Sequence, residues 1–285
     1  MEDRQSWLRA YASITLGGIV SIEHGPSGRR SIQVDAEVPG LPEDVWEAVA
    51  TGPGIGAWFY RTDLEERVGG FLKYHTGSGM VHVPAIVTVW DPPHRFRHEG
   101  KDCGPDGPPT ATEWTVEPRP GGRCVVRVVH SLIANADDWD DQLEKFEDGW
   151  PQALAVLRLY LTHFRGQRAI ILRASGNHDG SLRDAWQALL RELDADRLAL
   201  GERWTLPDAG EAGLRGVLDE LRSEGRQPCI LLRLDEPAPG IAAASAYKIA
   251  ERAGVMLSLY LYGDEGAIAA NGEAAWQAWV NARFP

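Results

Sequence analysis

The sequence contains little cysteine and no long apolar run, and both absences exclude classes of protein. Its 285 residues include three cysteines, Cys103, Cys124 and Cys229, which are too few and too scattered for a disulfide scaffold or a structural zinc site. No run approaches the ~18 apolar residues that span a membrane. The charged start at Met1–Arg4 is followed by no apolar stretch, so no signal peptide is evident. We therefore expect a cytoplasmic protein without membrane insertion.

Positive charge is scarce as well. The chain carries 29 lysines and arginines against 41 aspartates and glutamates, which gives a net charge of −12 and a pI of about 5.1. Nucleic acids and anionic membranes bind basic surfaces. The charge balance therefore argues against a nucleic-acid partner.

Motifs for phosphate, nucleophile and metal chemistry are missing too. The segment Gly52–Gly56 follows a predicted helix and carries no lysine, so it is not a phosphate loop, and neither G-x-S-x-G nor H-E-x-x-H occurs. His94 and His98 have the spacing of a metal pair but lack a third ligand. The run Asp137–Asp141 lacks the glycine and final glutamate of a calcium loop, and is predicted to be a solvated acidic turn. We expect neither a metal nor a cofactor.

Strand-like segments dominate the first half of the chain. Turn residues separate them about every ten positions, which is typical of an antiparallel meander. Proline and acidic residues in a first turn predict a helix at 42–49, and apolar periodicity predicts a longer one from Trp150 to Phe164, with Pro151 near its start. The predicted strands are 13–23, 30–37, 71–75, 81–90, 95–99, 111–117 and 124–132.

The second half repeats this order in a shorter form. The surroundings of Ile32 resemble those of Ile170, and Trp46 and Trp186 occupy similar helices. A strand at Val255–Tyr262 and a short final helix at 274–284 complete the second copy. An offset near half the chain length indicates a tandem repeat. We therefore predict an N-terminal extension at 1–28, a domain at 29–165 and a shorter domain at 169–285.

The shorter final helix distinguishes the second copy from the first. It should leave a smaller cavity or none, and Tyr260 falls roughly where the first copy has His130. We expect this copy to act as scaffold, by packing on the first copy, closing a sheet edge or forming a subunit contact. Sheet edges can also pair between chains, so a homodimer is a further expectation.

Ordered motifs along the first half resemble the SRPBCC superfamily (START and Bet v 1-like proteins), and within it the branch named after the C-terminal domain of the activator of Hsp90 ATPase. The matching residues are Val45-Trp46, Ala57-Trp58-Phe59, Val68-Gly69-Gly70-Phe71, Trp90 to Arg95, Val129-His130-Ser131, and Gly149-Trp150 leading into Leu154 and Leu157. The whole chain is similar to two-part actinobacterial members with a degenerate second half. The resemblance implies an α+β helix-grip fold, a curved antiparallel sheet around a long C-terminal helix, present twice in tandem.

The resemblance also implies a function. Such proteins hold lipids, polyketides, hormones and other hydrophobic molecules in a cavity between sheet and helix. Some members do chemistry there, aromatase/cyclases among them, and relatives in producers of enediyne antibiotics act as self-sacrificing resistance proteins.

Strand alternation predicts which first-half side chains line such a cavity. In 94–99 the inward set is His94, Phe96 and His98, with the charged residues outside. Thr112, Trp114 and Val116 face inward on the next strand, and Val126, Val128 and His130 on the one after, which leaves Arg127 in water. The predicted ligand-binding residues are Trp58, Phe96, His98, Trp114, Val128, His130, Trp150 and Leu154.

Four functions remain open at this point. The first is non-catalytic binding of a hydrophobic small molecule, because no convincing nucleophile or metal set is present. The second is a cyclase, dehydratase or hydrolase, with His130 or His98 as acid and base and with Tyr74 or a backbone amide polarising a carbonyl. A self-sacrificing resistance protein is the third. An Hsp90 co-chaperone ranks last, since we find no counterpart of a separate chaperone-binding domain.

Overall fold

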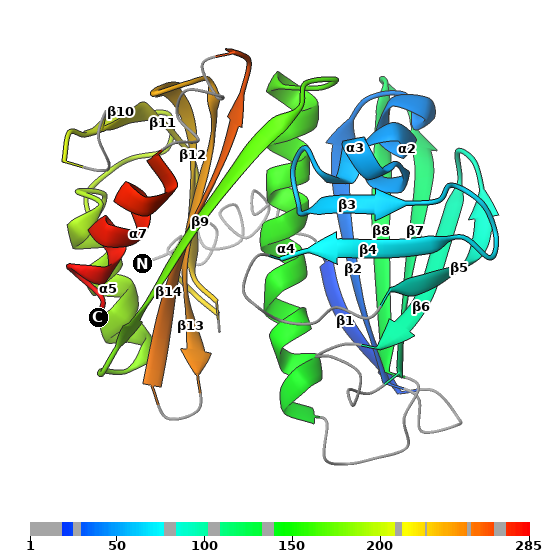
Figure 1. Cartoon of the computed structure of the whole chain (residues 1–285), viewed down its shortest axis with the longest axis horizontal. Helices are drawn as coiled ribbons and strands as arrows, with labels where there is room; N and C mark the ends of the chain where they lie inside the picture. Colours follow the sequence, from blue (N-terminus) through cyan, green and yellow to red (C-terminus); the bar gives the residue numbers. More distant parts are fainter. Residues whose placement is uncertain are drawn as a thin grey trace, which may run out of the picture.

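The computed structural model describes residues 19–24, 30–76, 84–101, 109–132, 140–208, 213–225, 227–249, 252–264 and 272–285. Two antiparallel sheets lie on either side of one long helix (Figure 1). Among the described residues, no helix is both long and apolar enough to cross a membrane. Cys124 and Cys229 are free thiols, and Cys103 lies outside the described residues.

The first sheet has eight strands in the order β1-β2-β8-β7-β6-β5-β4-β3. The last helix of the first copy, α4, is 24 residues long, and β2 packs along it. The elements are β1 (Ile19–His24), β2 (Arg30–Pro39), α2 (Pro42–Ala50), α3 (Gly52–Ile55), β3 (Arg61–Leu64), β4 (Phe71–His75), β5 (Ala85–Asp91), β6 (Arg95–Lys101), β7 (Pro109–Arg119), β8 (Arg123–Leu132) and α4 (Asp140–His163).

Local sequence explains the start of helix α2 and the turn between β7 and β8. Pro42 occupies the first turn of α2, where a missing N–H costs nothing, and the Asp44 carboxylate accepts a hydrogen bond from the backbone N–H of Leu41 at 3.3 Å. Gly121 and Gly122 both have positive φ, at 84° and 69°, as the turn between β7 and β8 requires. β1 falls within the predicted N-terminal extension and pairs with β2 at the sheet edge.

The second sheet repeats the connectivity of the first. Its order is β10-β11-β12-β13-β14-β9, so that in each copy the strand before the first helix pairs with the last strand of the meander. This confirms the α+β helix-grip prediction and its tandem pseudo-repeat. The elements are β9 (Ala169–His178), α5 (Leu182–Glu192), β10 (Arg203–Leu206), β11 (Leu214–Arg222), β12 (Cys229–Glu236), β13 (Gly240–Ile249), β14 (Arg252–Tyr262) and α7 (Glu273–Asn281).

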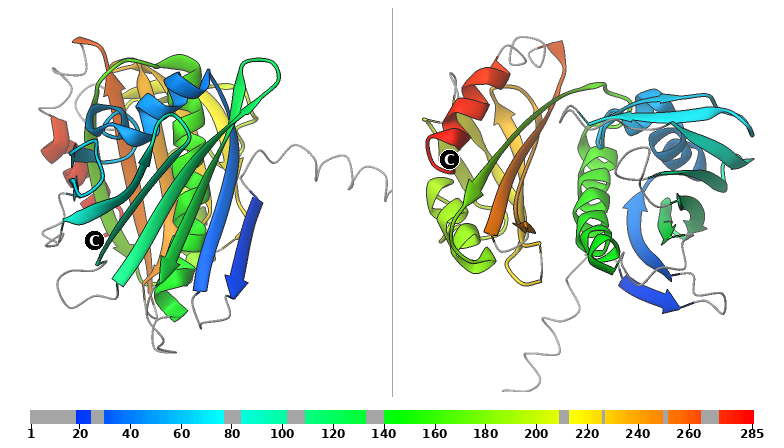
Figure 2. Two further views of the ribbon diagram at one scale, coloured as in Figure 1. Left: turned by 90° about the vertical axis from the view of Figure 1, so that its right-hand side faces the viewer. Right: turned by 60° about the horizontal axis from the view of Figure 1, so that its bottom comes forward.

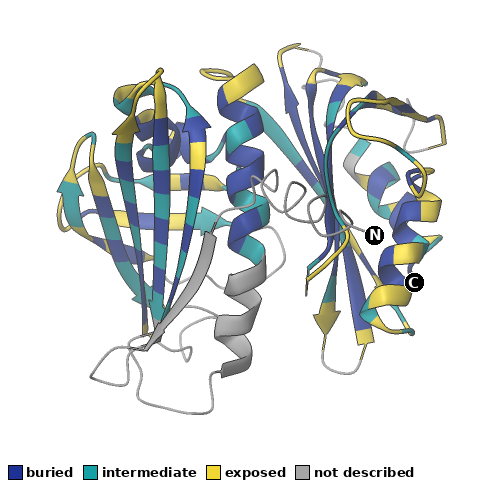
Figure 3. Cartoon of the chain, turned by 180° about the vertical axis from the view of Figure 1, so that it is seen from behind, coloured by how far each residue is buried: buried dark blue, intermediate teal, exposed yellow. Residues whose placement is uncertain are grey.

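The two copies share α4. In the second copy α5 and the short helix α7 cover the inner face of the sheet, and the outer face lies against α4 (Figure 2). Residues 154–161 of α4 are therefore buried almost all round, with Arg158 partly exposed (Figure 3). Leu231, Ile241 and Tyr262 of the second sheet belong to the apolar core of the first copy. Packing on the first copy, one of the three expected roles, is thus observed.

Two predicted boundaries need correction. α4 begins at Asp140 and not near Trp150, so Pro151 lies inside the helix, where its ring supplies no N–H to the preceding turn. Asp140 and Asp141 of the predicted acidic turn belong to this helix, whereas 137–139 lie outside the described residues, as do 13–18 and 81–83 of the predicted strands.

Candidate functional site

The inner face of β6, β7 and β8 carries the predicted alternation. Phe96, His98, Trp114, Val128 and His130 are all buried, and the intervening charged residues point outward. The strand register determines the neighbours on this face: His98 lies opposite Thr112, and Thr112 lies opposite His130. These three side chains form a polar row across the sheet, beside an apolar row of Phe96, Trp114 and Val128.

Hydrogen bonds connect members of the polar row. Thr112 Oγ1 and His130 Nδ1 are 2.9 Å apart, and both side chains are buried. At the other end, the Tyr74 hydroxyl from β4 lies 3.5 Å from Nε2 of His98. An imidazole ring held in this way has a set orientation, which either ligand recognition or proton transfer needs. Thr112 is predicted from the sequence to face inward but not to belong to the site, because only the register shows that it lies between two histidines.

Trp150 from α4 lies close to the polar row. Its ring stacks on Phe59 at a centroid distance of 5.6 Å, meets Trp114 edge-on at 5.3 Å and lies 6.4 Å from the ring of His130. The indole N–H groups of Trp114 and Trp150 are buried, and neither finds an acceptor among the described residues. A buried donor without an acceptor costs about 1–3 kcal/mol, so an acceptor brought to either N–H group would be stabilising.

The other predicted site residues pack around this group. Trp58 is fully buried, but its N–H donates to the carbonyl of Ala48 at 2.9 Å, and its ring supports Trp114 from behind at 6.1 Å. Val128 and Leu154 belong to the same apolar core. Because the Trp58 N–H already donates to Ala48, Trp58 can offer a ligand only its ring.

His94 does not face inward as predicted. It is exposed, because it closes the turn after β5, where its backbone N–H donates to the carbonyl of Asp91 at 2.8 Å, and the alternation of β6 begins only at Arg95. His94 and His98 therefore do not converge on a shared metal. Within the part of the chain that the structure describes, no group of three or more His, Cys, Asp or Glu side chains could hold a metal ion.

The described residues of the second copy form no such polar row, and Tyr260 does not take the place of His130. His130 pairs with Ile32, and the matching Ile170 pairs with Leu261, which is buried in the inner core of the second copy. Tyr260 is one residue earlier and faces α4. A shift of one residue along a strand moves a side chain to the other face. The equivalent of the inner histidine is thus a leucine.

The second copy instead holds one wall of the first-copy site. Nη2 of Arg173 donates to the carbonyl of Phe59 at 2.6 Å, and its guanidinium lies 3.9 Å from the centroid of the Tyr60 ring. The hydroxyl of Tyr262 donates to the carbonyl of Ala57 at 2.9 Å. These contacts fix the segment 57–60, which presents Phe59 to Trp150. Sequence reasoning missed this role of Arg173, although an arginine that interrupts an apolar strand is a signal for it.

Comparisons with known proteins extend the description of the first copy. The model of the family described as activator of Hsp90 ATPase homolog 1-like protein matches residues 41–162, which run from α2 almost to the end of α4. Uncharacterized proteins from two strains of Mycobacterium tuberculosis, CDC 1551 and H37Rv, are each 31% identical over 104 residues, covering 33% of this chain and 71% of the relative.

Similar solved structures include two that span most of the chain. The di-domain ARO/CYC protein BexL from the BE-7585A biosynthetic pathway is 15% identical, with a TM-score of 0.41, over 90% of this chain and 98% of its own. DynU16, from the dynemicin biosynthetic locus, is 18% identical with a TM-score of 0.40, over 88% and 96%. CalU16 from Micromonospora echinospora is 19% identical with a TM-score of 0.40, over 51% and 85%.

Proposed function

The chain belongs to the family of activator of Hsp90 ATPase homolog 1-like proteins, in the SRPBCC superfamily, and on this premise we propose that its first copy binds a largely apolar small molecule beside the polar row, without catalysis. The ligand would be a lipid, a polyketide or another secondary metabolite that carries one or more acceptor oxygens.

The buried N–H groups of Trp114 and Trp150 carry this proposal. They lie next to His130 and Thr112, amid aromatic and aliphatic side chains. Binding sites for small molecules commonly combine an apolar lining with a few placed polar groups. A keto or carboxyl oxygen between the two indoles would satisfy donors that the described part of the protein leaves without acceptors.

Replacing either indole by phenyl should weaken binding while keeping an aromatic wall. We expect Trp150→Phe and Trp114→Phe to lower the affinity for an aromatic polyketide such as emodin, or for palmitic acid, by about three- to tenfold, which corresponds to one lost hydrogen bond. Thermal shift with each compound, followed by calorimetry, measures the change.

Trp186→Phe is the matched control. Trp186 is also buried with an N–H that lacks an acceptor among the described residues, but it lies in the second copy, whose described part contains no polar row. We expect this variant to bind as the wild type does. Equal losses in all three variants would contradict the proposal. So would a wild-type protein that neither compound stabilises and that carries no small molecule in native mass spectrometry after purification from its own host.

An acid–base enzyme is the second candidate. The observation that favours it is the pair of oriented imidazoles, His130 bonded to Thr112 and His98 beside Tyr74. If the protein turns over an aromatic polyketide substrate, His130→Gln should reduce the rate by about 10²–10⁴-fold, the usual contribution of general acid–base catalysis. Affinity should change far less. Product analysis by mass spectrometry measures the rate, and an unchanged rate in both His130→Gln and His98→Gln would rule this candidate out.

A further inference from the structure

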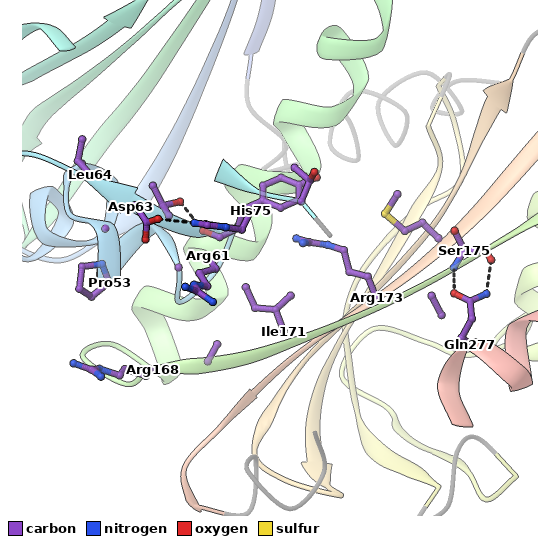
Figure 4. A pocket seen from close by; sticks show the side chains of 18 of the residues that line it. Pro53, Arg61, Asp63, Leu64, His75, Arg168, Ile171, Arg173, Ser175 and Gln277 are labelled. Atoms are coloured by element: carbon purple, nitrogen blue, oxygen red, sulfur yellow. Dashed lines mark hydrogen bonds and ion pairs between the residues drawn. The ribbon is translucent and has the colours of Figure 1, made fainter. Parts of the chain in front are cut away.

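A second hollow lies between the two copies. It is an open cleft of about 1270 Å³, bounded by β3 and β4 of the first copy and by β9 of the second (Figure 4). Tyr60 and His75 line it from one side, and Ile171, Arg173 and Ser175 from the other. The cleft is distinct from the polar row, because no member of that row is among its described lining residues. The two are neighbours: Phe59 stacks on Trp150, and the next residue, Tyr60, borders the cleft.

The charge in the cleft opposes the charge of the chain. Three arginines, Arg61, Arg168 and Arg173, line it, with Asp63 as the only carboxylate among the described lining residues, in a protein of net charge −12. Asp63 is already engaged: His75 Nε2 lies 2.7 Å from its carboxylate, and this hydrogen bond is the main reason that the pKa of Asp63 is lowered. An excess of positive charge therefore remains for a ligand.

Two of these guanidinium groups suit anion recognition in complementary ways. Arg173 is held in place by the Phe59 carbonyl and the Tyr60 ring through contacts that occupy only part of its donor set. Arg61 is exposed and extends from β3 toward β9 (Figure 4), and its attraction to Asp63 is a minor cause of the lowered pKa of that carboxyl group. An exposed guanidinium beside a fixed one can bind a carboxylate, sulfate or phosphate in a bidentate manner.

The rest of the cleft surface is mixed. Ile171, Met256 and Tyr247 supply apolar surface from the second copy, and Leu64 and Phe71 supply it from the first. A ligand held here would thus need an apolar body as well as an acidic group.

We propose that this cleft binds an amphipathic organic anion between the two copies, with its acidic group on Arg61 and Arg173 and its apolar body on Ile171 and Met256. This site is separate from the one beside the polar row, although Arg173 also holds the segment 57–60 that presents Phe59 to Trp150.

A pair of fluorescent probes tests the proposal. Anilinonaphthalene sulfonate carries an anionic group, and N-phenylnaphthylamine has the same ring system without it. The wild type should bind the sulfonate more tightly than the neutral amine. Arg61→Gln should weaken sulfonate binding about tenfold and leave amine binding unchanged. Arg61→Lys keeps the charge but not the paired N–H donors of arginine, so its sulfonate affinity should lie between those of the wild type and Arg61→Gln. Arg67→Gln, which removes an exposed arginine from the loop after β3, is the control and should match the wild type.

Each possible result of the probe-binding measurements either supports or contradicts the proposed anion site. Sulfonate affinity within twofold of the wild type in both Arg61 variants would overturn the proposal, as would equal affinities for the two probes. Sulfonate binding that is lost in Trp150→Phe but kept in Arg61→Gln would place the probe beside the polar row and also overturn it. Far-UV circular dichroism checks that each variant is folded. If the site beside the polar row proves not to bind ligand, the Arg61 dependence of sulfonate binding remains a separate result.

Discussion

Replacing Gly176 by alanine should destabilise the protein by about 3 kcal/mol, the upper range for overpacking a closely packed contact. A Cβ at this position would lie 2.3 Å from the carbonyl oxygen of Phe284 and 2.6 Å from its Cβ. Backbone cannot yield as a flexible side chain can, and the same Phe284 carbonyl accepts a hydrogen bond from Asn177 at 3.2 Å. The segment that follows α7 would have to move away from β9. Urea denaturation, compared at the transition midpoint, measures the loss.

Gly149→Ala is the control for adding one methyl group. Gly149 lies within α4, and no described atom outside its own helical turns lies within 4 Å of the place that an alanine methyl group would take. Alanine is the better helix former by about 0.8–1 kcal/mol, so this variant should be slightly more stable than the wild type. Opposite signs for the two variants are the expected result. A Gly176→Ala protein as stable as the wild type would mean that α7 does not dock on β9 as described.

Tyr262→Phe should cost about 1–3 kcal/mol, because it leaves the buried Ala57 carbonyl without its donor. The ring itself is retained, including its stacking on Phe164 at 4.2 Å. Tyr60→Phe is the control, since phenyl preserves the contact with the Arg173 guanidinium; it should stay within about 0.5 kcal/mol of the wild type. Equal stabilities of the Tyr262→Phe and Tyr60→Phe proteins would show that the Tyr262 hydroxyl contributes nothing.

The same substitution should change the response to alkaline pH. Burial is the main cause that raises the pKa of Tyr262 well above its usual value. Above about pH 10 the unfolded chain loses this proton and the folded chain keeps it, so the stability from this group is complete below that pH and declines as pH rises, by up to about 1.4 kcal/mol per pH unit. The free energy of unfolding at about pH 8 and about pH 11 should therefore differ less in Tyr262→Phe than in the wild type.

The inner face of the first sheet can be predicted because its period is two. Burial alternates at 95–98 of β6, at 112–117 of β7 and at 124–130 of β8, so Phe96, Trp114 and Val128 can be assigned without a structure. The prediction for His94 is wrong because a turn residue follows no alternation. The interaction between Thr112 and His130 depends on pairing between strands, which a single sequence does not specify.

The second sheet is harder to predict, because both of its faces are buried. β13 is buried continuously from Gly240 to Ala246, and such a run gives no alternation from which to assign faces. For that reason the sequence alone matches Tyr260 to His130, although Tyr260 faces α4 and Leu261 faces inward. An apolar run of this kind is nevertheless a usable sign that something covers the outer face.

The covered outer face of the second sheet also limits assembly. The copies meet front to back, the helix of one against the sheet of the next, and a contact between unlike surfaces can in principle add units without end. The outer face of the first sheet carries ion pairs. Arg127 holds Asp35 in a two-point ion pair, with Nη2 to Oδ2 at 2.8 Å, and reaches Glu117 at 3.1 Å, so the face that a further helix would have to cover is charged. At the position where Asp35 stands, the second copy has Arg173, which serves the contact between copies. Equivalent positions thus carry an aspartate on the outer face of the first sheet and, on the outer face of the second sheet, an arginine that contacts the first copy.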